Sequence, residues 1–269
     1  MIDSHVHLNR LELAAESSQV LDRARQAGVL GFLNVGYDLV SSRESMALAA
    51  SDPRILATVG IHPHDALMLA DGQGSLTAEG EAALTELAEM AADPRVVAIG
   101  EIGLDFFRDL SPRPAQRAAL TAQLALADKV GLPVVFHVRD AWSEILAHID
   151  KCGVPRAQGV LHSFSGNADS VAWARERGFL LGIGGPVTYK NSQLPALVAQ
   201  AGVDMILLET DAPWLPPVPF RGKRNEPSYL PFTLKKVAEI LAMDPDAVAR
   251  RTTESFCRLF GAPAARRFS

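Results

Sequence analysis

The chain of 269 residues is 48% hydrophobic and 21% charged, which is typical of a globular protein and excludes a disordered or collagen-like chain. Its formal net charge of -5 argues against a strongly basic nucleic-acid-binding module. An enzyme acting on nucleic acid stays open, because bound divalent metal ions supply local positive charge.

Eight short, mostly apolar runs alternate with helical stretches along the chain. Such runs are typical of strands in a parallel sheet that helices cover on both faces. The predicted strands are Met1–His5, Gly31–Val35, Ile55–Gly60, Val96–Gly100, Val134–His137, Gly159–His162, Phe179–Gly182 and Met205–Glu209. The predicted helices are Ser17–Ala27, Arg43–Ala50, Glu79–Ala91, Pro114–Val130, Ala141–Lys151, Asp169–Arg177, Gln193–Ala201, Tyr229–Ala242 and Asp246–Phe260.

This alternation predicts a single domain folded as a closed (β/α)8 barrel, the TIM barrel, with a doubly wound open sheet as the alternative. We expect the barrel to span residues 1–262 and residues 263–269 to form a flexible C-terminal tail. Cys152 and Cys257 belong to no Cys-x-x-Cys pair, so we expect two small buried side chains rather than a disulfide or a zinc site.

No membrane span is predicted, because Asp128 and Lys129 interrupt the longest apolar stretch. The N-terminus shows no basic segment followed by an apolar run, which is the pattern of a secretion signal. We therefore expect a cytoplasmic protein, and we expect it to act as a monomer.

Histidines and carboxylates recur at the carboxyl ends of the predicted strands, which is where a (β/α)8 barrel builds its active site. His5 and His7 are two residues apart on one strand, so both side chains can reach one metal ion. A single histidine at a strand end is more often a hydrogen-bonded core residue. Here five of the seven histidines lie at such ends, and their convergence indicates a site: His5, His7, His62, His137 and His162.

Glu101 and Asp211 add carboxylates to this set of imidazoles. Four histidines with Glu101 and Asp211 make six ligands, which are too many for one tetrahedral zinc ion but suit two divalent ions with open positions for water. The donor set is permissive and accepts Mg, Mn or Zn. The sequence therefore predicts two divalent metal ions per chain.

Seven motifs follow one another along almost the whole chain, and together they resemble the TatD family of metal-dependent hydrolases, within the amidohydrolase-like barrels. Ser163 stands where many members of that family carry cysteine, and Phe220 stands where histidine is frequent. The motifs are Asp3–Leu8, Gly60–His64, Gly100–Asp105, His137–Ala141, His162–Gly166, Glu209–Pro213 and Arg221–Pro227.

The resemblance implies a role for each residue of the site. One ion would be held by His5, His7, Glu101 and Asp211. The second would be held by Glu101, His137 and His162, so that Glu101 bridges the two.

The same resemblance implies catalytic roles for Asp211, Glu101 and His62. Asp211 would orient or deprotonate the attacking water, and His62 would lie near the substrate or its leaving group. Asp3 and Glu209 would lie behind the metal ligands and hold ligand histidines in one tautomer.

Basic residues near the predicted site favour a phosphate-bearing substrate. Arg139 follows a ligand histidine by two residues, so we expect it to point into the same pocket. Phe106, Trp214 and Tyr189 could stack on bases or could simply pack. The loop after the eighth strand supplies the other predicted substrate-binding residues, Arg221, Lys223, Arg224 and Asn225.

The resemblance implies a deoxyribonuclease of the 3′–5′ exonuclease type, which cleaves phosphodiester bonds with a hydroxide activated by two metal ions. The alternative is a D-aminoacyl-tRNA deacylase that hydrolyses an ester at the same site. Nucleic acid is thus the expected partner, either DNA or aminoacyl-tRNA. A non-catalytic binding barrel with structural histidines, and a deaminase or lactonase of the wider superfamily, are further alternatives.

Overall fold

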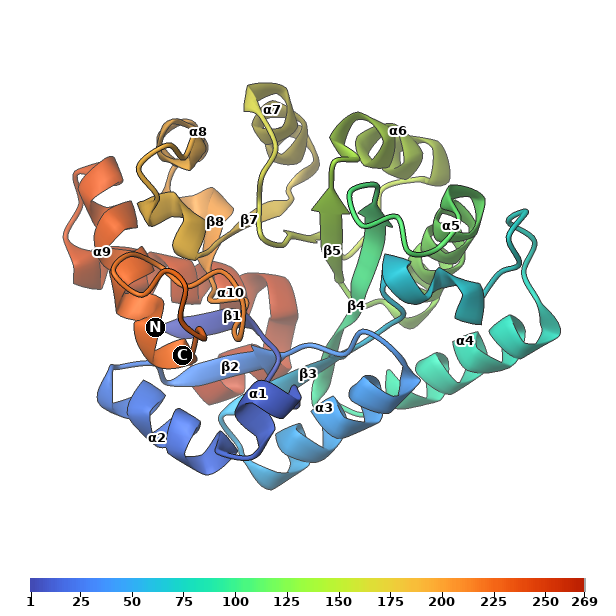
Figure 1. Cartoon of the computed structure of the whole chain (residues 1–269), viewed down its shortest axis with the longest axis horizontal. Helices are drawn as coiled ribbons and strands as arrows, with labels where there is room; N and C mark the ends of the chain where they lie inside the picture. The colour runs from blue at the N-terminus through green and yellow to red at the C-terminus, as the bar shows by residue number, and fades with distance from the viewer. Residues whose placement is uncertain (269) are drawn as a thin grey trace.

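The computed structural model describes residues 1–268 and shows eight parallel strands arranged in the order of the chain (Figure 1). Main-chain hydrogen bonds just beyond the last strand join it to the first: Asp211 N–H donates to His5 O at 2.9 Å, and His7 N–H donates to Ala212 O at 3.0 Å. The sheet therefore closes, and the predicted (β/α)8 barrel is confirmed. The strands are β1 (Ile2–Val6), β2 (Gly31–Asn34), β3 (Ile55–Val59), β4 (Val96–Asp105), β5 (Val134–Arg139), β6 (Gly159–Leu161), β7 (Leu180–Ile183) and β8 (Ile206–Leu208).

Helices form the outer layer around the strands (Figure 1). The α-helices are α1 (Leu11–Ala14), α2 (Ser17–Gln26), α3 (Leu39–Ser51), α4 (Ala78–Met90), α5 (Arg113–Val130), α6 (Trp142–Cys152), α7 (Ala168–Arg177), α8 (Leu194–Ala201), α9 (Leu230–Leu241) and α10 (Pro245–Phe268). Short 3-10 helices are η1 (Pro63–Met68), η2 (Gly185–Thr188), η3 (Val203–Met205) and η4 (Pro227–Tyr229). None of the helices within residues 1–268 combines the length and apolarity that a membrane crossing requires.

Two element boundaries differ from the prediction. Helix α3 begins before Arg43, because Asp38 and Ser41 form a reciprocal cap: Asp38 Oδ1 accepts from Ser41 N–H at 2.6 Å, and Ser41 Oγ accepts from Asp38 N–H at 2.9 Å. Strand β4 continues past Gly100 to Asp105, so Glu101 lies within the strand rather than after it.

The barrel interior is filled by apolar side chains at the amino-terminal part of the strands. Phe256 and Phe260 of α10 pack against these side chains, so α10 covers that end of the barrel. Each strand contributes to this cluster, through Ile2, Leu33, Leu56, Val97, Val135, Val160, Leu180 and Leu207.

The predicted flexible tail is wrong for residues 263–268. These residues continue α10 beyond a kink at Gly261, where φ is 71° and ψ is -155°. Ala264 is fully buried, and a Cβ atom on Gly31 would lie 2.6 Å from the Phe268 ring. The spacing of Ala264 and Phe268, four residues apart, places both on one helix face, and burial of that face holds the segment. Ser269 lies outside the described residues.

The prediction for the cysteines also fails in part. Cys152 is exposed at the end of α6, and Cys257 is only partly buried. No disulfide joins the two residues.

An irregularity in β1 decides which side chains enter the site. The pairing of β1 with β2 shifts between Asp3 and Val6. In a regular strand Ile2 and His5 would point to opposite faces, because side chains alternate. The shift lets Ile2 join the interior apolar cluster while His5 and His7 also face the barrel axis, nearer its carboxyl end.

Candidate metal centre

Glu101 lies at the centre of the histidines that the sequence singled out. Its Oε2 is 3.4 Å from His5 Nε2 and 3.8 Å from His7 Nε2. Its Oε1 is 2.8 Å from His137 Nδ1 and 3.3 Å from His162 Nε2. The two oxygens therefore face two different imidazole pairs, which is the geometry expected of a bridging carboxylate.

Asp211 completes the half of the site that contains His5 and His7. Its Oδ1 is 3.9 Å from His5 Nε2 and 3.7 Å from His7 Nε2, and the two imidazole nitrogens are 3.1 Å apart. Asp211 has φ at +55°, a left-handed conformation that few non-glycine residues adopt. All six predicted metal ligands thus converge on one place.

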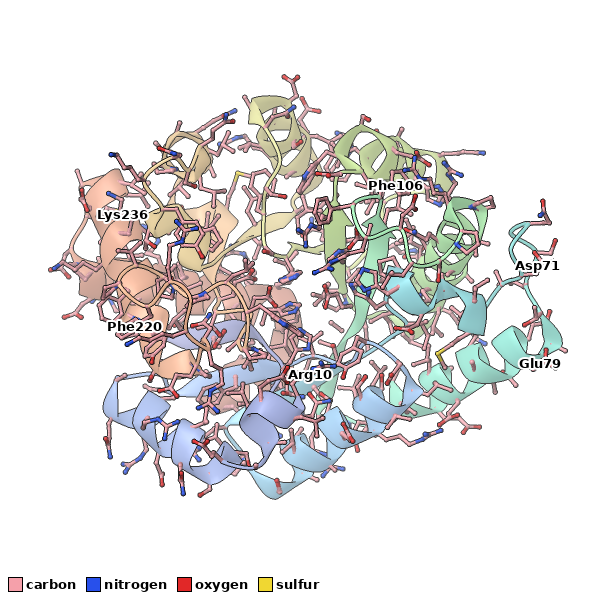
Figure 2. The ribbon with its side chains drawn as sticks, in the orientation of Figure 1. Arg10, Asp71, Glu79, Phe106, Phe220 and Lys236 are labelled. Carbon is pink, nitrogen blue, oxygen red and sulfur yellow. The ribbon has the colours of Figure 1, made fainter. Side chains whose placement is uncertain are left out.

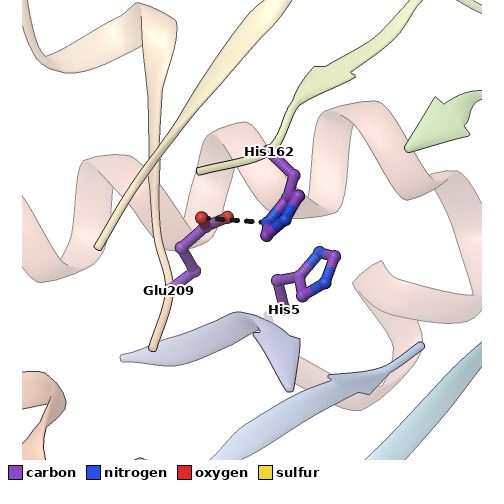
Figure 3. Close-up of side chains that lie close together, drawn as sticks. All are labelled: His5, His162 and Glu209. Carbon is purple, nitrogen blue, oxygen red and sulfur yellow. Dashed lines mark hydrogen bonds and ion pairs between the residues drawn. The ribbon is translucent and has the colours of Figure 1, made fainter. Parts of the chain in front are cut away.

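Glu209 contacts His162 in the way that the prediction requires. Figure 3 shows its carboxylate beside the ring, with Oε1 3.2 Å from His162 Nδ1, and the same oxygen accepts the Ser163 N–H at 2.6 Å. The His162 ring stacks on His5, with 3.5 Å between the centroids. Gly182 makes room for this carboxylate, because a Cβ atom there would lie 2.1 Å from Glu209 Oε2.

Asp3 does not contact a histidine ring, which corrects its predicted role. Its Oδ1 accepts the Thr210 N–H at 2.9 Å, and its Oδ2 accepts the Thr210 hydroxyl at 2.6 Å. It also receives the main-chain N–H of His5 at 3.4 Å. Asp3 therefore fastens the seam between the first and last strands, beneath the site rather than behind an imidazole.

His62 faces the same carboxylate as the ligand histidines. Its Nδ1 accepts the His64 N–H at 3.1 Å, so in the neutral ring the proton is on Nε2. That Nε2 lies 3.6 Å from Glu101 Oε1, which makes His62 a hydrogen-bond donor directed into the centre.

Asp105 is the main site residue that the sequence reasoning missed. Its Oδ2 is 3.2 Å from His137 Nε2 and 2.8 Å from His64 Nε2. Its Oδ1 accepts the main-chain N–H groups of Phe107 at 3.0 Å and Arg108 at 2.8 Å. The signal was present, because Asp105 follows Glu101 by four residues on one strand, and even spacings share a face.

The protonation states of His5, His7 and Glu101 suit the binding of a divalent cation, which needs neutral imidazoles and ionised carboxylates. Burial lowers the pKa of His5 to about 4 and that of His7 to about 3, so both rings are neutral and able to ligate. Burial raises the pKa of Asp211 to about 7. Burial opposes ionisation of Glu101 too, but His162, His5 and His62 hold the pKa of its carboxyl well below the usual range.

His162 differs from the other ring ligands. Burial disfavours its charged form, yet the carboxylates of Glu209, Glu101 and Asp211 together raise its pKa well above the usual value. A protonated imidazole cannot ligate, so a cation bound at His162 must displace a proton.

The residues present fit a divalent metal. Within residues 1–268, the only ion-pair partners of Glu101, Asp211 and Glu209 are imidazoles, with no lysine or arginine among them. A protonated His162 ring balances these buried carboxylates only in part, and a divalent ion supplies further positive charge. Donor atoms lie within 4.8 Å of one another in three groups: His5, His7 and Asp211; His5, His162 and Glu209; and His62, Glu101 and His137.

A cleft of about 570 Å³ opens over the centre, with His137, His162 and Asp211 in its wall. Arg139 lines this cleft, in agreement with its predicted position. Ser163, at the position where many members of the family that the chain resembles have cysteine, also lines the cleft. Its backbone φ is +44°.

The loop after β8 does not present its basic residues to the cleft. Asn225 is fully buried and donates to the main-chain oxygens of Thr210 at 2.8 Å and Trp214 at 2.6 Å. Arg224 lies 3.4 Å from Glu16, on the outside of the barrel. Neither residue lies where it was predicted: Asn225 shapes the loop, and Arg224 ties it to α1 and to Glu16, just before α2.

Arg221 and Lys223 are exposed, and neither lines the cleft. Arg221 lies over the Tyr189 ring, 4.4 Å from its centroid, and Lys223 lies 5.9 Å from the centroid of Phe220. Tyr189 donates its hydroxyl to Pro216 O at 2.9 Å, so this ring supports the loop.

Trp214 lies beside His7 and is 41% exposed. Its ring meets the His7 ring edge to face at 5.0 Å, and Arg10 lies over it at 5.5 Å. Arg10, labelled in Figure 2, also lies near Tyr37, with 3.2 Å from Nη1 to the hydroxyl oxygen. No sequence pattern had marked Arg10 as a neighbour of the site.

A (β/α)8 barrel that gathers imidazoles and carboxylates around one glutamate has the architecture of a metal-dependent hydrolase. Residues 2–261 match the family model described as TatD related DNase. The chain belongs to the TatD family of metal-dependent hydrolases, which confirms the resemblance seen in the motifs.

The chain is similar to named relatives over nearly their full length. The chain is 38% identical to the 3'-5' ssDNA/RNA exonuclease TatD of Yersinia pseudotuberculosis, over 97% of this chain and 99% of that protein. It is 36% identical to the uncharacterized metal-dependent hydrolase YabD of Bacillus subtilis, over 97% and 98% of the two chains. The crystal structure of YjjV, a TatD homolog from Escherichia coli, superposes with a TM-score of 0.87 at 28% identity, covering 98% of each chain.

Proposed function

We propose that this enzyme is a nuclease that hydrolyses phosphodiester bonds of single-stranded nucleic acid from the 3′ end, with two divalent ions. The observation that carries the proposal is the position of Glu101, whose two oxygens face separate imidazole pairs. The activity printed for the Yersinia relative, an exonuclease on single-stranded DNA and RNA, supports the choice of substrate.

The residues divide into two groups around Glu101. His5, His7 and Asp211 would hold one ion with Glu101 Oε2, and His137 and His162 would hold the other with Oε1. Two bound ions, whether Mg, Mn or Zn, supply an activated water and neutralise negative charge on the phosphate oxygens.

Asp211 and His62 supply the proton chemistry. Burial raises the pKa of Asp211 to about 7 without metal ions, and a bound cation lowers it again, so we expect Asp211 to orient the attacking water and pass its proton on rather than hold it. His62 carries its proton on Nε2 and directs it into the centre, where it donates to a phosphate oxygen or to the leaving group. Glu209 and Asp105 hold the His162 and His137 rings in place through their second nitrogens.

The test is a cleavage assay on 5′-labelled single-stranded DNA with Mn²⁺. We expect a ladder of products shortened from the 3′ end, no products with EDTA, and at least a ~100-fold loss of rate for Asp211→Asn. Asp169→Asn, on the surface of α7, is the matched control and should cleave like the wild type. Full activity of Asp211→Asn would refute the proposed role.

An enzyme with the same metal centre would also be able to hydrolyse a carboxylic ester, so the D-aminoacyl-tRNA deacylase alternative remains a prediction. A parallel assay on D-aminoacyl-tRNA separates the two, because only the deacylase would release the amino acid. A monomeric state and a cytoplasmic location also remain predictions.

A further inference from the structure

Arg139 and Phe107 form a pair at the rim of the cleft that the proposed hydrolysis does not use. The Arg139 guanidinium carbon lies 4.0 Å from the centroid of the Phe107 ring. Arg139 lines the cleft beside His137, and Phe107 is 56% exposed. A large exposed ring and a cation thus lie together next to the metal centre.

The backbone fixes this pair before any ligand arrives. Arg139 is the sheet partner of Asp105, and its carbonyl accepts the Phe106 N–H at 2.9 Å. The Phe107 N–H donates to Asp105 Oδ1 at 3.0 Å. Because Asp105 also holds the His137 ring, the pair is positioned relative to the metal centre itself.

A neighbouring arginine–phenylalanine pair, Arg113 and Phe106, differs from Arg139 and Phe107 in its contacts. Arg113 lies over Phe106 at 4.2 Å, but its Nε is also 3.2 Å from Asp109 Oδ2, and Phe106 packs against the core. Within residues 1–268, Arg139 has no carboxylate at ion-pair distance. The Arg113 charge is thus paired and the Phe106 ring is packed. The Arg139 charge has no carboxylate partner among the described residues, and the Phe107 ring is exposed.

We propose that Arg139 and Phe107 form a nucleotide subsite, in which Arg139 binds a backbone phosphate and Phe107 stacks on the adjoining base. A guanidinium held over a ring by its carbon still has N–H donors, and these match phosphate oxygens. Only an unpaired base can stack on a protein ring, so the subsite selects single-stranded nucleic acid. This inference deepens the proposed function and rests on it for the direction of the strand into the centre.

The test measures binding without cleavage. A fluorescein-labelled single-stranded oligonucleotide is titrated with the protein in EDTA and followed by fluorescence anisotropy. We expect Kd to rise about 5- to 150-fold for Phe107→Leu, the range for losing one stacked base. Arg139→Gln should weaken binding and also reduce the slope of log Kd against log salt by about 0.7, the share of one phosphate contact on a single strand. Phe107→Leu should leave that slope unchanged.

Arg113→Gln is the matched control, because it removes an arginine whose charge is already paired. It should bind the oligonucleotide like the wild type. A thermal melt confirms that each variant is folded.

Cleavage with Mn²⁺ then separates the two proposals. For both subsite variants, we expect kcat/KM on the oligonucleotide to fall relative to kcat/KM on a small p-nitrophenyl phosphodiester. If the wild type cleaves neither substrate while the binding pattern holds, the proposed function fails and the subsite stands. If the wild type cleaves but Arg139→Gln and Phe107→Leu bind like Arg113→Gln, or weaken duplex and single-strand binding equally, the subsite is wrong.

Discussion

The two ends of the barrel are made from the same eight strands but differ completely in chemistry. At the amino-terminal end, one apolar layer is covered by Phe256 and Phe260 of α10. At the carboxyl end, buried imidazoles and carboxylates surround Glu101. The difference indicates that the first end stabilises the fold, while the second carries a cost in stability that bound cations offset.

The largest expected effect is at the carboxyl end, in Glu101→Ala. Removing the carboxylate that faces both imidazole pairs should lower kcat/KM by on the order of 1,000-fold or more, because both of the proposed ions would lose a ligand. The rise in Tm that Mn²⁺ gives the wild type should also be lost, and a thermal melt with and without metal measures it. Glu81→Ala, on the exposed face of α4, is the control and should keep both properties. A Glu101→Ala protein with wild-type activity would contradict the assignment.

The next effect is at the amino-terminal end, in Phe256→Ala. Phe256 is 1% exposed, so its truncation should lower the free energy of unfolding by about 3–5 kcal/mol. Below the unfolding temperature, kcat should stay at the wild-type value, because the metal centre lies at the other end. Phe232→Ala is the matched control: that ring is 39% exposed and its loss should cost clearly less in a urea titration. A large fall in kcat of folded Phe256→Ala would show that the two ends are not independent.

The smallest effect concerns Asp3, at the seam between the first and last strands. Burial raises its pKa to about 8 in the folded protein, against about 4 in an unfolded chain. The folded state therefore binds the extra proton between these values, and its stability falls as the pH rises through them. Asp3→Asn removes this dependence while keeping a side-chain oxygen for the Thr210 N–H.

We therefore expect the change in the free energy of unfolding caused by Asp3→Asn, measured in EDTA, to be more favourable at pH 8 than at pH 5 by up to about 3.6 kcal/mol. Urea titrations at the two pH values measure this difference. An identical difference at both pH values would mean that the Asp3 carboxyl does not titrate in this range.

The barrel and the convergence of the six candidate ligands were predictable because both depend on local periodicity. The two-residue spacing of His5 and His7, and the apolar runs that precede Glu101 and Asp211, are visible in the sequence, and parallel strands bring their ends to one edge. The pairing shift in β1 was not visible, because it depends on the neighbouring strand.

The loop after β8 was predicted less well for a related reason. Its charges were read as substrate contacts, but a loop's path is decided by tertiary hydrogen bonds such as those of Asn225 to Thr210 and Trp214. Asp105 was overlooked because the predicted strand stopped at Gly100, so its shared face with Glu101 was not considered.

The seam between Asp3 and Thr210 joins residues 207 positions apart, and Phe268 packs on Gly31. A nascent chain leaving the ribosome therefore exposes the outer edge of β1, with its unpaired main-chain groups, until residues 206–268 have emerged. The order of synthesis thus places ring closure after translation of residues 206–268, and the imidazoles and carboxylates of the centre come together only then.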